Sequence, residues 1–144
     1  MRPAHKGHFM TSAIALSTTV LALALVSAAA SAQDNIALQP IKLPAAGKTA
    51  SFKGSIRGYE SVDYTFRAQA GHKLRIDFKT PSTSAYFNLL DDGSGEALHI
   101  GSVAGSRYEG KLPSAGDYRV RVYLMRSAAR KKASAHYQLA LRVD

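Results

Sequence analysis

The sequence predicts an all-β fold, and within that class an antiparallel β-sandwich of about eight short strands. Over most of the chain after residue 49, apolar residues occupy every second position, which is typical of strands with one face on a core and the other in water. Clusters of Gly, Pro, Asp and Ser separate these runs, as turns do in a sandwich. No amphipathic helix of convincing length interrupts them.

Each expected strand is an alternating run or a short apolar stretch between turn signals. In chain order these are residues 52–56, 62–68, 74–78, 85–90, 97–100, 118–124 and 137–143. The turn signals are Ala70-Gly71, Asp92-Gly93-Ser94-Gly95 and Pro113-Ser114-Ala115-Gly116, where Gly supplies positive φ and Pro presets the turn. The Ala- and Arg-rich stretch 125–133 lies between the last two strands, and we expect a helical turn there, within a long hairpin loop.

The first 32 residues are predicted to be a cleaved signal peptide. Arg2 and Lys6 precede an apolar run over residues 13–26 and the small-residue cleavage site Ala30-Ser31-Ala32. The apolar run is shorter than the roughly 20 residues of a transmembrane helix, so no membrane span is expected; a retained N-terminal anchor is the rival interpretation. Two prolines predict an extended N-terminal segment over residues 33–48, which leaves residues 49–144 as the sandwich domain.

Composition excludes several kinds of protein. The chain has no cysteine, so it has no disulfide framework, thiolate metal site or cysteine nucleophile. With 19 Lys+Arg against 10 Asp+Glu, the formal net charge is +9, and it falls to +7 when Arg2 and Lys6 leave with the signal peptide. This excess suggests an anionic partner. Export argues against nucleic acid as that partner.

Nothing in the sequence makes a case for an enzyme, a metal site or a cofactor. His72, His99 and His136 lack metal-ligand spacing, and we expect them to be solvated or on edge strands. No G-x-S-x-G motif accompanies the serines. The acids of residues 91–96 surround two glycines without the alternating oxygen spacing of a calcium loop, so a hairpin turn is expected there.

The densest charge feature is the segment 126–132, which contains four bases. Arg119 and Arg121, on the outward face of the preceding strand, bring the cluster to six. It is a solvated loop, a nonspecific polyanion-binding loop, or a pair of arginines that enters an acidic pocket on a partner. Arg126 and Arg130 lie four residues apart, so a helical turn would project both the same way. Composition does not choose among the three.

Three stretches taken together are distinctive. The first is Gly54-Ser55-Ile56-Arg57-Gly58-Tyr59, followed by residues 64–68 and 71–74. The second covers residues 112–122 and begins Leu112-Pro113-Ser114-Ala115-Gly116-Asp117-Tyr118. The third is Arg126-Ser127-Ala128-Ala129-Arg130-Lys131-Lys132, followed by Tyr137 in the last strand. From about residue 47 to residue 143 the chain resembles the bacterial periplasmic inhibitors of goose-type (g-type) lysozyme. The L-P-x-x-G-x-Y element occurs in many secreted β-sandwich domains, including those appended to peptidases. The R-x-x-A-R loop combined with the Gly-Tyr pair is the specific part, and residues 82–105 match less clearly.

The resemblance implies a periplasmic protein without enzymatic activity, metal or cofactor, whose partner is a g-type lysozyme. Its loops would enter and block the substrate cleft, which would protect peptidoglycan and help to evade host defence. The family's lysozyme-binding roles fall on Tyr59, Arg126 and Arg130, and Ser127 would fill the remaining space. The alternative is a secreted β-sandwich module that binds anionic glycans or envelope lipids through the basic loop.

Overall fold

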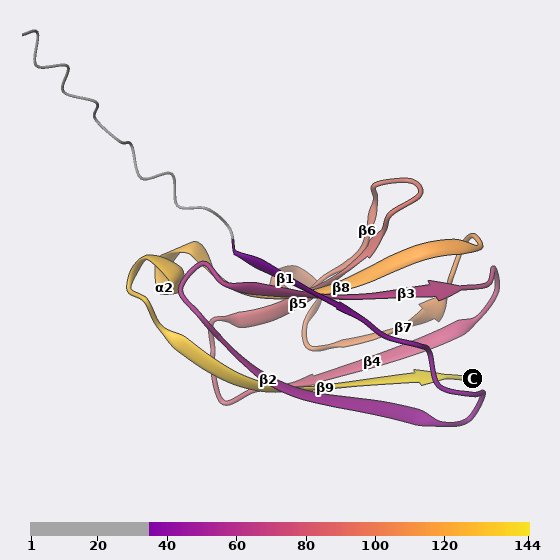
Figure 1. The fold of residues 1–144 in the computed structure, drawn as a ribbon, viewed down its shortest axis with the longest axis horizontal. Coiled ribbons are helices and arrows are strands. Elements are labelled where there is room, and N and C mark those ends of the chain that lie inside the picture. The colour runs from indigo at the N-terminus through magenta and orange to yellow at the C-terminus, as the bar shows by residue number, and fades with distance from the viewer. Residues whose placement is uncertain (1–34) are drawn as a thin grey trace, which may run out of the picture.

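Two sheets packed face to face make up residues 35–144, the part of the chain that the computed structural model describes (Figure 1). The five-stranded sheet has the order β1 (Ile36–Pro40), β3 (Ser61–Ala68), β8 (Gly116–Leu124), β5 (Ala85–Asp91) and β6 (Ala97–Ile100). The four-stranded sheet has the order β2 (Thr49–Arg57), β9 (Ser134–Val143), β4 (Lys73–Lys79) and β7 (Arg107–Lys111). Two short helices are α1 (Gly101–Ala104) and α2 (Arg126–Arg130). The predicted all-β sandwich is therefore confirmed.

Of the nine strands within residues 35–144, β1 and β7 have no counterpart among the predicted runs. The strand β1 lies in the segment predicted to be extended, and it pairs in parallel with β3 while all other strand pairs are antiparallel. Pro40 ends this edge strand, where its missing N–H breaks no ladder. In β7, Tyr108 is the one large apolar side chain, so no alternation is visible. The predicted signal peptide lies outside the described residues.

The core lies between the sheets and is filled by the apolar members of the alternating runs. Leu74, Ile76, Phe87, Val120 and Leu139 are all fully buried. Within residues 35–144 no helix is both long and apolar enough to cross a membrane. The stretch 126–130 is helical, as predicted, and joins β8 to β9.

The L-P-x-x-G-x-Y stretch has a structural explanation in Tyr118. Its hydroxyl donates a 2.5 Å hydrogen bond to the Ser114 carbonyl, and the Ser114 amide approaches the same hydroxyl at 3.3 Å. Tyr118 is fully buried, so this contact satisfies its polar end while the ring fills the core. Such a tyrosine that holds the turn before its own strand is common in β-sandwiches, which explains why the motif says little about function.

The polar turn residues and the histidines were partly predicted. Asp91 accepts from the amides of Gly93 at 2.9 Å and Ser94 at 3.4 Å, so the expected β5–β6 hairpin turn is confirmed. His99 lies on the edge strand β6, as expected, but it is buried rather than solvated, because its ring stacks on Phe87 with 4.7 Å between centroids.

A buried hydrogen bond between two tyrosine side chains joins the two sheets. The hydroxyls of Tyr64 on β3 and Tyr137 on β9 lie 2.8 Å apart. Gly54 is the cross-strand partner of Tyr137, and a Cβ added there would come within 2.5 Å of the Tyr137 hydroxyl oxygen. The absence of a side chain at Gly54 therefore leaves the space that the end of the Tyr137 ring occupies. Burial, with a smaller contribution from Tyr64, raises the pKa of the Tyr137 hydroxyl well above its usual value.

We expect Tyr137→Phe to lower the free energy of unfolding by about 1–2 kcal/mol at neutral pH, because the Tyr64 hydroxyl loses its buried partner. A raised folded-state pKa gives stability that is complete below the unfolded pKa of about 10 and is lost as the pH rises above it. The loss of stability above about pH 10 should therefore be smaller in the variant. Denaturant unfolding of both proteins, at neutral pH and above about pH 10, measures the difference in stability loss.

The control is Tyr86→Phe. Tyr86 is half-buried on β5 of the five-stranded sheet, and its hydroxyl donates to the Thr83 carbonyl. An alkaline loss of stability that is identical in Tyr137→Phe and the parent protein would contradict the assignment.

Candidate functional site

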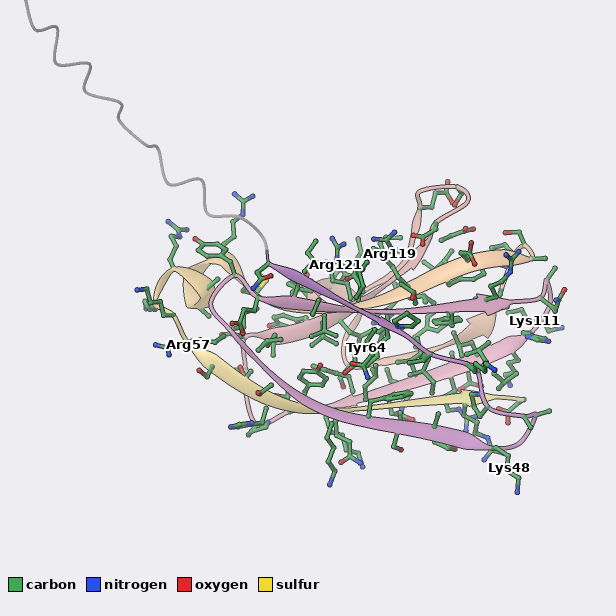
Figure 2. The ribbon with its side chains drawn as sticks, viewed as in Figure 1. Lys48, Arg57, Tyr64, Lys111, Arg119 and Arg121 are labelled. Atoms are coloured by element: carbon green, nitrogen blue, oxygen red, sulfur yellow. The ribbon has the colours of Figure 1, made fainter. Side chains whose placement is uncertain are left out.

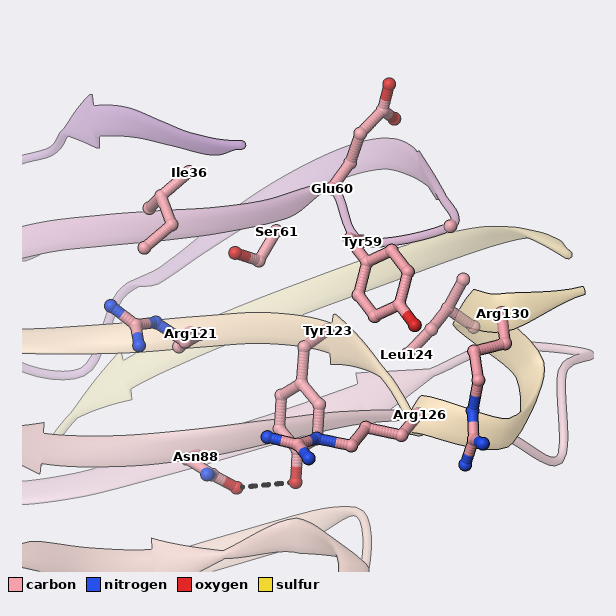
Figure 3. Close-up of a pocket in the computed structure, with 11 residues that line it drawn as sticks. Ile36, Tyr59, Glu60, Ser61, Asn88, Arg121, Tyr123, Leu124, Arg126 and Arg130 are labelled. Atoms are coloured by element: carbon pink, nitrogen blue, oxygen red, sulfur yellow. Dashed lines mark hydrogen bonds between the residues drawn. The ribbon is translucent and has the colours of Figure 1, made fainter. Parts of the chain in front are cut away.

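A hollow of about 650 Å³ lies at one end of the sandwich, beside α2 (Figure 3). Its lining comes from the β2–β3 turn, the ends of β1, β3 and β8, the middle of β5, and α2. The lining residues are Ile36, Gly58, Tyr59, Glu60, Ser61, Asn88, Arg121, Tyr123, Leu124, Arg126 and Arg130. Segments about 70 residues apart in the chain thus form one surface, which local sequence patterns do not reveal.

The helix α2 presents two arginines to this hollow. It is held at its start by the Met125 amide, which donates to the Ser84 carbonyl at 2.9 Å. Ala129 is 2% exposed and faces the core, so only a small side chain fits there. Arg126 and Arg130 flank it, exposed, and both line the hollow. Their spacing of four residues places them on the same side of the helical turn, as predicted.

The β2–β3 turn presents Tyr59, and it is hydrogen-bonded to the loop that follows α2. The Gly58 amide donates to the Ala133 carbonyl at 2.9 Å, and Arg57 Nε donates to the Lys132 carbonyl at 3.3 Å. Gly58 has φ +58, a conformation that favours glycine. Tyr59 remains 36% exposed. The Gly-Tyr pair therefore combines a residue that permits the turn with an aromatic side chain offered to solvent.

The floor of the hollow is polar and hydrogen-bonded. The Tyr123 hydroxyl donates to Asn88 Oδ1 at 3.1 Å, and the Gly101 amide donates to the same oxygen at 3.1 Å. Glu60, at the rim, accepts from the Arg57 amide at 3.0 Å. Sequence reasoning missed Glu60, Asn88 and Tyr123, because nothing in the local pattern separates them from other outward strand and turn residues.

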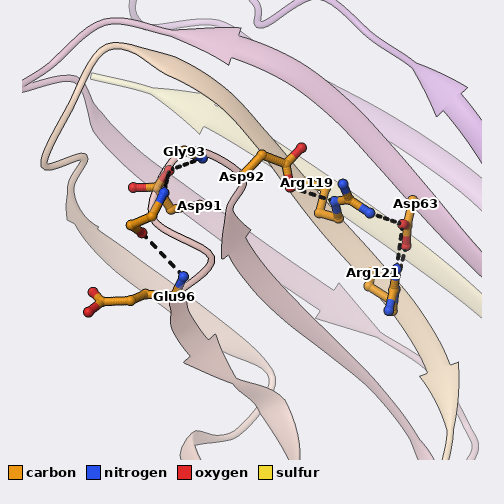
Figure 4. Close-up of polar contacts among 8 residues, drawn as sticks. Asp63, Asp91, Asp92, Gly93, Glu96, Arg119 and Arg121 are labelled. Carbon is orange, nitrogen blue, oxygen red and sulfur yellow. Dashed lines mark hydrogen bonds and ion pairs between the residues drawn. The ribbon is translucent and has the colours of Figure 1, made fainter.

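Asp63 corrects one expectation from the alternating pattern (Figure 4). Its position on β3 predicts a solvated side chain, yet it is fully buried on the outer face of the five-stranded sheet. Arg121 covers it with bonds of 2.7 and 2.8 Å, and Arg119 with one of 3.0 Å. Three charge-assisted hydrogen bonds compensate the carboxylate for its lost hydration.

The same hydrogen bonds remove two of the six bases from the predicted charge cluster. Arg119 also binds Asp92 at 2.7 Å, and hydrogen bonding to Asp92, followed by that to Asp63, raises the pKa of the Arg119 guanidinium. Arg119 and Arg121 are therefore neutralised by acids of their own sheet. The free positive charge at the hollow is that of Arg126 and Arg130, for which residues 35–144 provide no ion pair.

Three of the four predicted binding residues surround the hollow. Tyr59 arrives from the turn, and Arg126 and Arg130 arrive from α2 (Figure 3). Ser127 is exposed on α2 but does not line the hollow. A planar guanidinium can hold a carboxylate with two hydrogen bonds, so this surface can receive acidic groups of a partner. The role of Tyr59, Arg126, Ser127 and Arg130 in binding stays a prediction.

No protein-family model matches the chain. A crystal structure of a periplasmic inhibitor of g-type lysozyme from Aeromonas hydrophila is similar, with 30% identity and a TM-score of 0.68; the match covers 77% of this chain and 99% of that one. The "Inhibitor of g-type lysozyme" of Escherichia coli is 28% identical over 96 residues, which are 66% of this chain and 72% of that protein. These relatives are inhibitors rather than enzymes, in agreement with the expected lack of catalytic activity.

The fold is shared more widely. The pre-peptidase C-terminal domain of a collagenase from Bacillus anthracis has a TM-score of 0.55 at 19% identity, over 73% of this chain and 94% of that one. At that identity the likeness concerns the fold alone.

Replacement of Asp63 by Asn should lower the free energy of unfolding by about 2–3 kcal/mol, since two guanidiniums lose their buried counter-charge. The loss stays below that of a fully buried pair because the Arg119 and Arg121 side chains are 31% and 30% exposed. Asp117→Asn is the matched control, as its contact with Arg67 is 3.8 Å long and exposed, and it should cost under about 0.5 kcal/mol. Equal midpoints of denaturation for the two variants would contradict this account.

Proposed function

Because this chain belongs to the family of periplasmic inhibitors of g-type lysozyme, we propose that it inhibits such a lysozyme by placing the end of the sandwich around α2 into the substrate cleft. The observation that carries the proposal is the convergence of Tyr59, Arg126 and Arg130 from two loops on one hollow. The protein acts by occupancy, with no chemistry of its own. It protects peptidoglycan in the periplasm, where its relatives are found.

Each of these side chains has a role that follows from its chemistry. Arg126 and Arg130 meet carboxylate and carbonyl groups around the catalytic glutamate, as the family resemblance implies. Tyr59 adds a large aromatic contact with a hydrogen-bonding end, a combination frequent among interface residues that dominate affinity. Ser127 and the neighbouring backbone fill the remaining space. The two arginines are not neutralised within residues 35–144, so they are available to a partner's acids.

The hydrogen bonds between the two loops favour tight binding. Gly58 and Arg57 are joined to the α2 loop by bonds of 2.9 and 3.3 Å. A surface that is already ordered loses less conformational freedom when it binds. The absence of cysteine means that these contacts and the sheet ladders, rather than a disulfide, hold the loops in place.

Titration of the purified mature protein into a g-type lysozyme acting on cell walls should abolish lysis at a clear molar excess. Chicken-type and invertebrate-type lysozymes, assayed side by side, show whether the inhibition is specific to the g-type enzyme. Undiminished lysis by the g-type enzyme would overturn the proposal.

The double variant Arg126→Ala/Arg130→Ala should bind the lysozyme about a hundredfold more weakly, or worse, if the two arginines are central to the interface. The matched control Lys48→Ala/Lys111→Ala removes the same charge at the opposite end of the sandwich (Figure 2) and should leave the inhibition constant unchanged. Unchanged inhibition by the arginine variant would remove the site assignment.

Salt separates the proposed inhibitor from the alternative module that binds anionic glycans or envelope lipids through the same loop. Polyanion binding through α2 would weaken steeply as salt rises, whereas arginines enclosed in a protein cleft are screened less. Inhibition titrations at two salt concentrations make the comparison.

A further inference from the structure

Positive charge is distributed unequally between the two faces of the sandwich. The outward side chains of the four-stranded sheet, with Asp144 after β9, include seven bases and three acids, a net +4. The bases are Lys53, Lys73, Arg75, Lys79, Arg107, Lys111 and Arg142; Arg57 is set aside because it contacts the α2 loop. We refer to this surface as the basic face.

The five-stranded sheet provides the contrast. Its outer face has three arginines, Arg67, Arg119 and Arg121, and each of them pairs with an acid of the same face. Those acids are Asp63, Asp92 and Asp117, so the net charge there is zero. Of the two sheets, only the four-stranded one therefore has an outer face with excess positive charge. Further bases lie on α2, at the end of the strands (Figure 1), and in the loop that follows it.

Three lysines of the basic face have no acid partner within residues 35–144. They are Lys53, Lys79 and Lys111, whereas Lys73, Arg75, Arg107 and Arg142 all contact acids. Lys53 and Lys79 lie on either side of Gln138, across β2, β9 and β4. Two adjoining hollows of about 410 and 180 Å³ share Lys79 and Gln138 in their lining, and His136 lines the larger one.

We propose that the basic face is a docking surface for the anionic headgroups of a lipid bilayer. Its bases are spread over all four strands rather than along one line, which suits a charged plane better than a single polymer strand. Lysine is a compact, hydrated charge that attracts phosphate without fixed geometry. Each base near an anionic membrane surface contributes to such adsorption.

The contact is peripheral, and it leaves the α2 end free. The large apolar side chains that are exposed within residues 35–144 are Ile36, Leu38, Tyr59, Ile100, Val103 and Met125. None of them lies on β2, β4, β7 or β9, so these strands offer no large exposed apolar side chain to insert among acyl chains. Tyr59 and Arg126 line the hollow at the strand ends rather than on this face, so lipid and lysozyme engage different surfaces.

Co-sedimentation of the mature protein with phospholipid vesicles tests the proposal. Vesicles of about three parts phosphatidylcholine to one part phosphatidylglycerol should retain the protein, and pure phosphatidylcholine should not. Binding should disappear as NaCl rises from about 0.05 to 0.5 M. The variant Lys53→Gln/Lys79→Gln/Lys111→Gln should lower the partition coefficient by about a hundredfold.

The matched control is Lys42→Gln/Lys131→Gln/Lys132→Gln, which removes the same charge outside the basic face. It should bind vesicles within about threefold of the parent protein. An equal loss in both variants, equal retention by neutral vesicles, or retention by heparin but not by anionic vesicles would each overturn the proposal. Lysozyme inhibition by the Lys53/Lys79/Lys111 variant should be unchanged, so failure here is distinguishable from failure of the proposed inhibitor function.

Discussion

The pairing of β2 with β9 is the constraint on which the rest of the structure depends. Nine residue pairs, from Thr49↔Arg142 to Arg57↔Ser134, join strands that are far apart in the chain. The middle of this ladder places Gly54 opposite Tyr137, whose hydroxyl meets Tyr64 of the other sheet. The end of the ladder brings the β2–β3 turn against the loop after α2. A slip of this pairing by one residue would turn the buried side chains outward and would separate the two loops. The core and the hollow therefore both depend on the same strand register.

Strict alternation made much of the fold predictable. The strands β3, β8 and β9 bury one face each, and in such strands period-two patterns are clear. The strands β1 and β7 were not predicted, because the first is an exposed edge strand and the second has charged residues at three of its five positions. The burial of Asp63 was missed for a different reason. Its burial depends on two arginines of a neighbouring strand, and a pattern within one strand contains no information about its neighbours.

The candidate site was predictable in its residues but not in its geometry. Spacing alone placed Arg126 and Arg130 on one side of a turn, and the family resemblance added Tyr59. That all three line one hollow follows from the β2–β9 ladder, a pairing between distant segments. The supporting contacts of Asn88 and Tyr123 depend equally on the neighbouring β5 and β8. Residue type can thus be read locally, whereas convergence requires the topology.

Net charge alone is a poor guide to what this protein binds. Arg119 and Arg121 count toward the basic total, yet they neutralise Asp63 and Asp92 and hold the outer face of their own sheet together. Within residues 35–144, the bases without an ion pair include Arg126 and Arg130 at the strand ends and three lysines of the four-stranded sheet. Arginines near a hollow suit a few oriented carboxylates, and dispersed lysines suit a diffuse anionic plane. Because the two groups occupy different surfaces, a molecule adsorbed through its lysines would still present its arginines, and attraction to lipid and recognition of a protein partner need not compete.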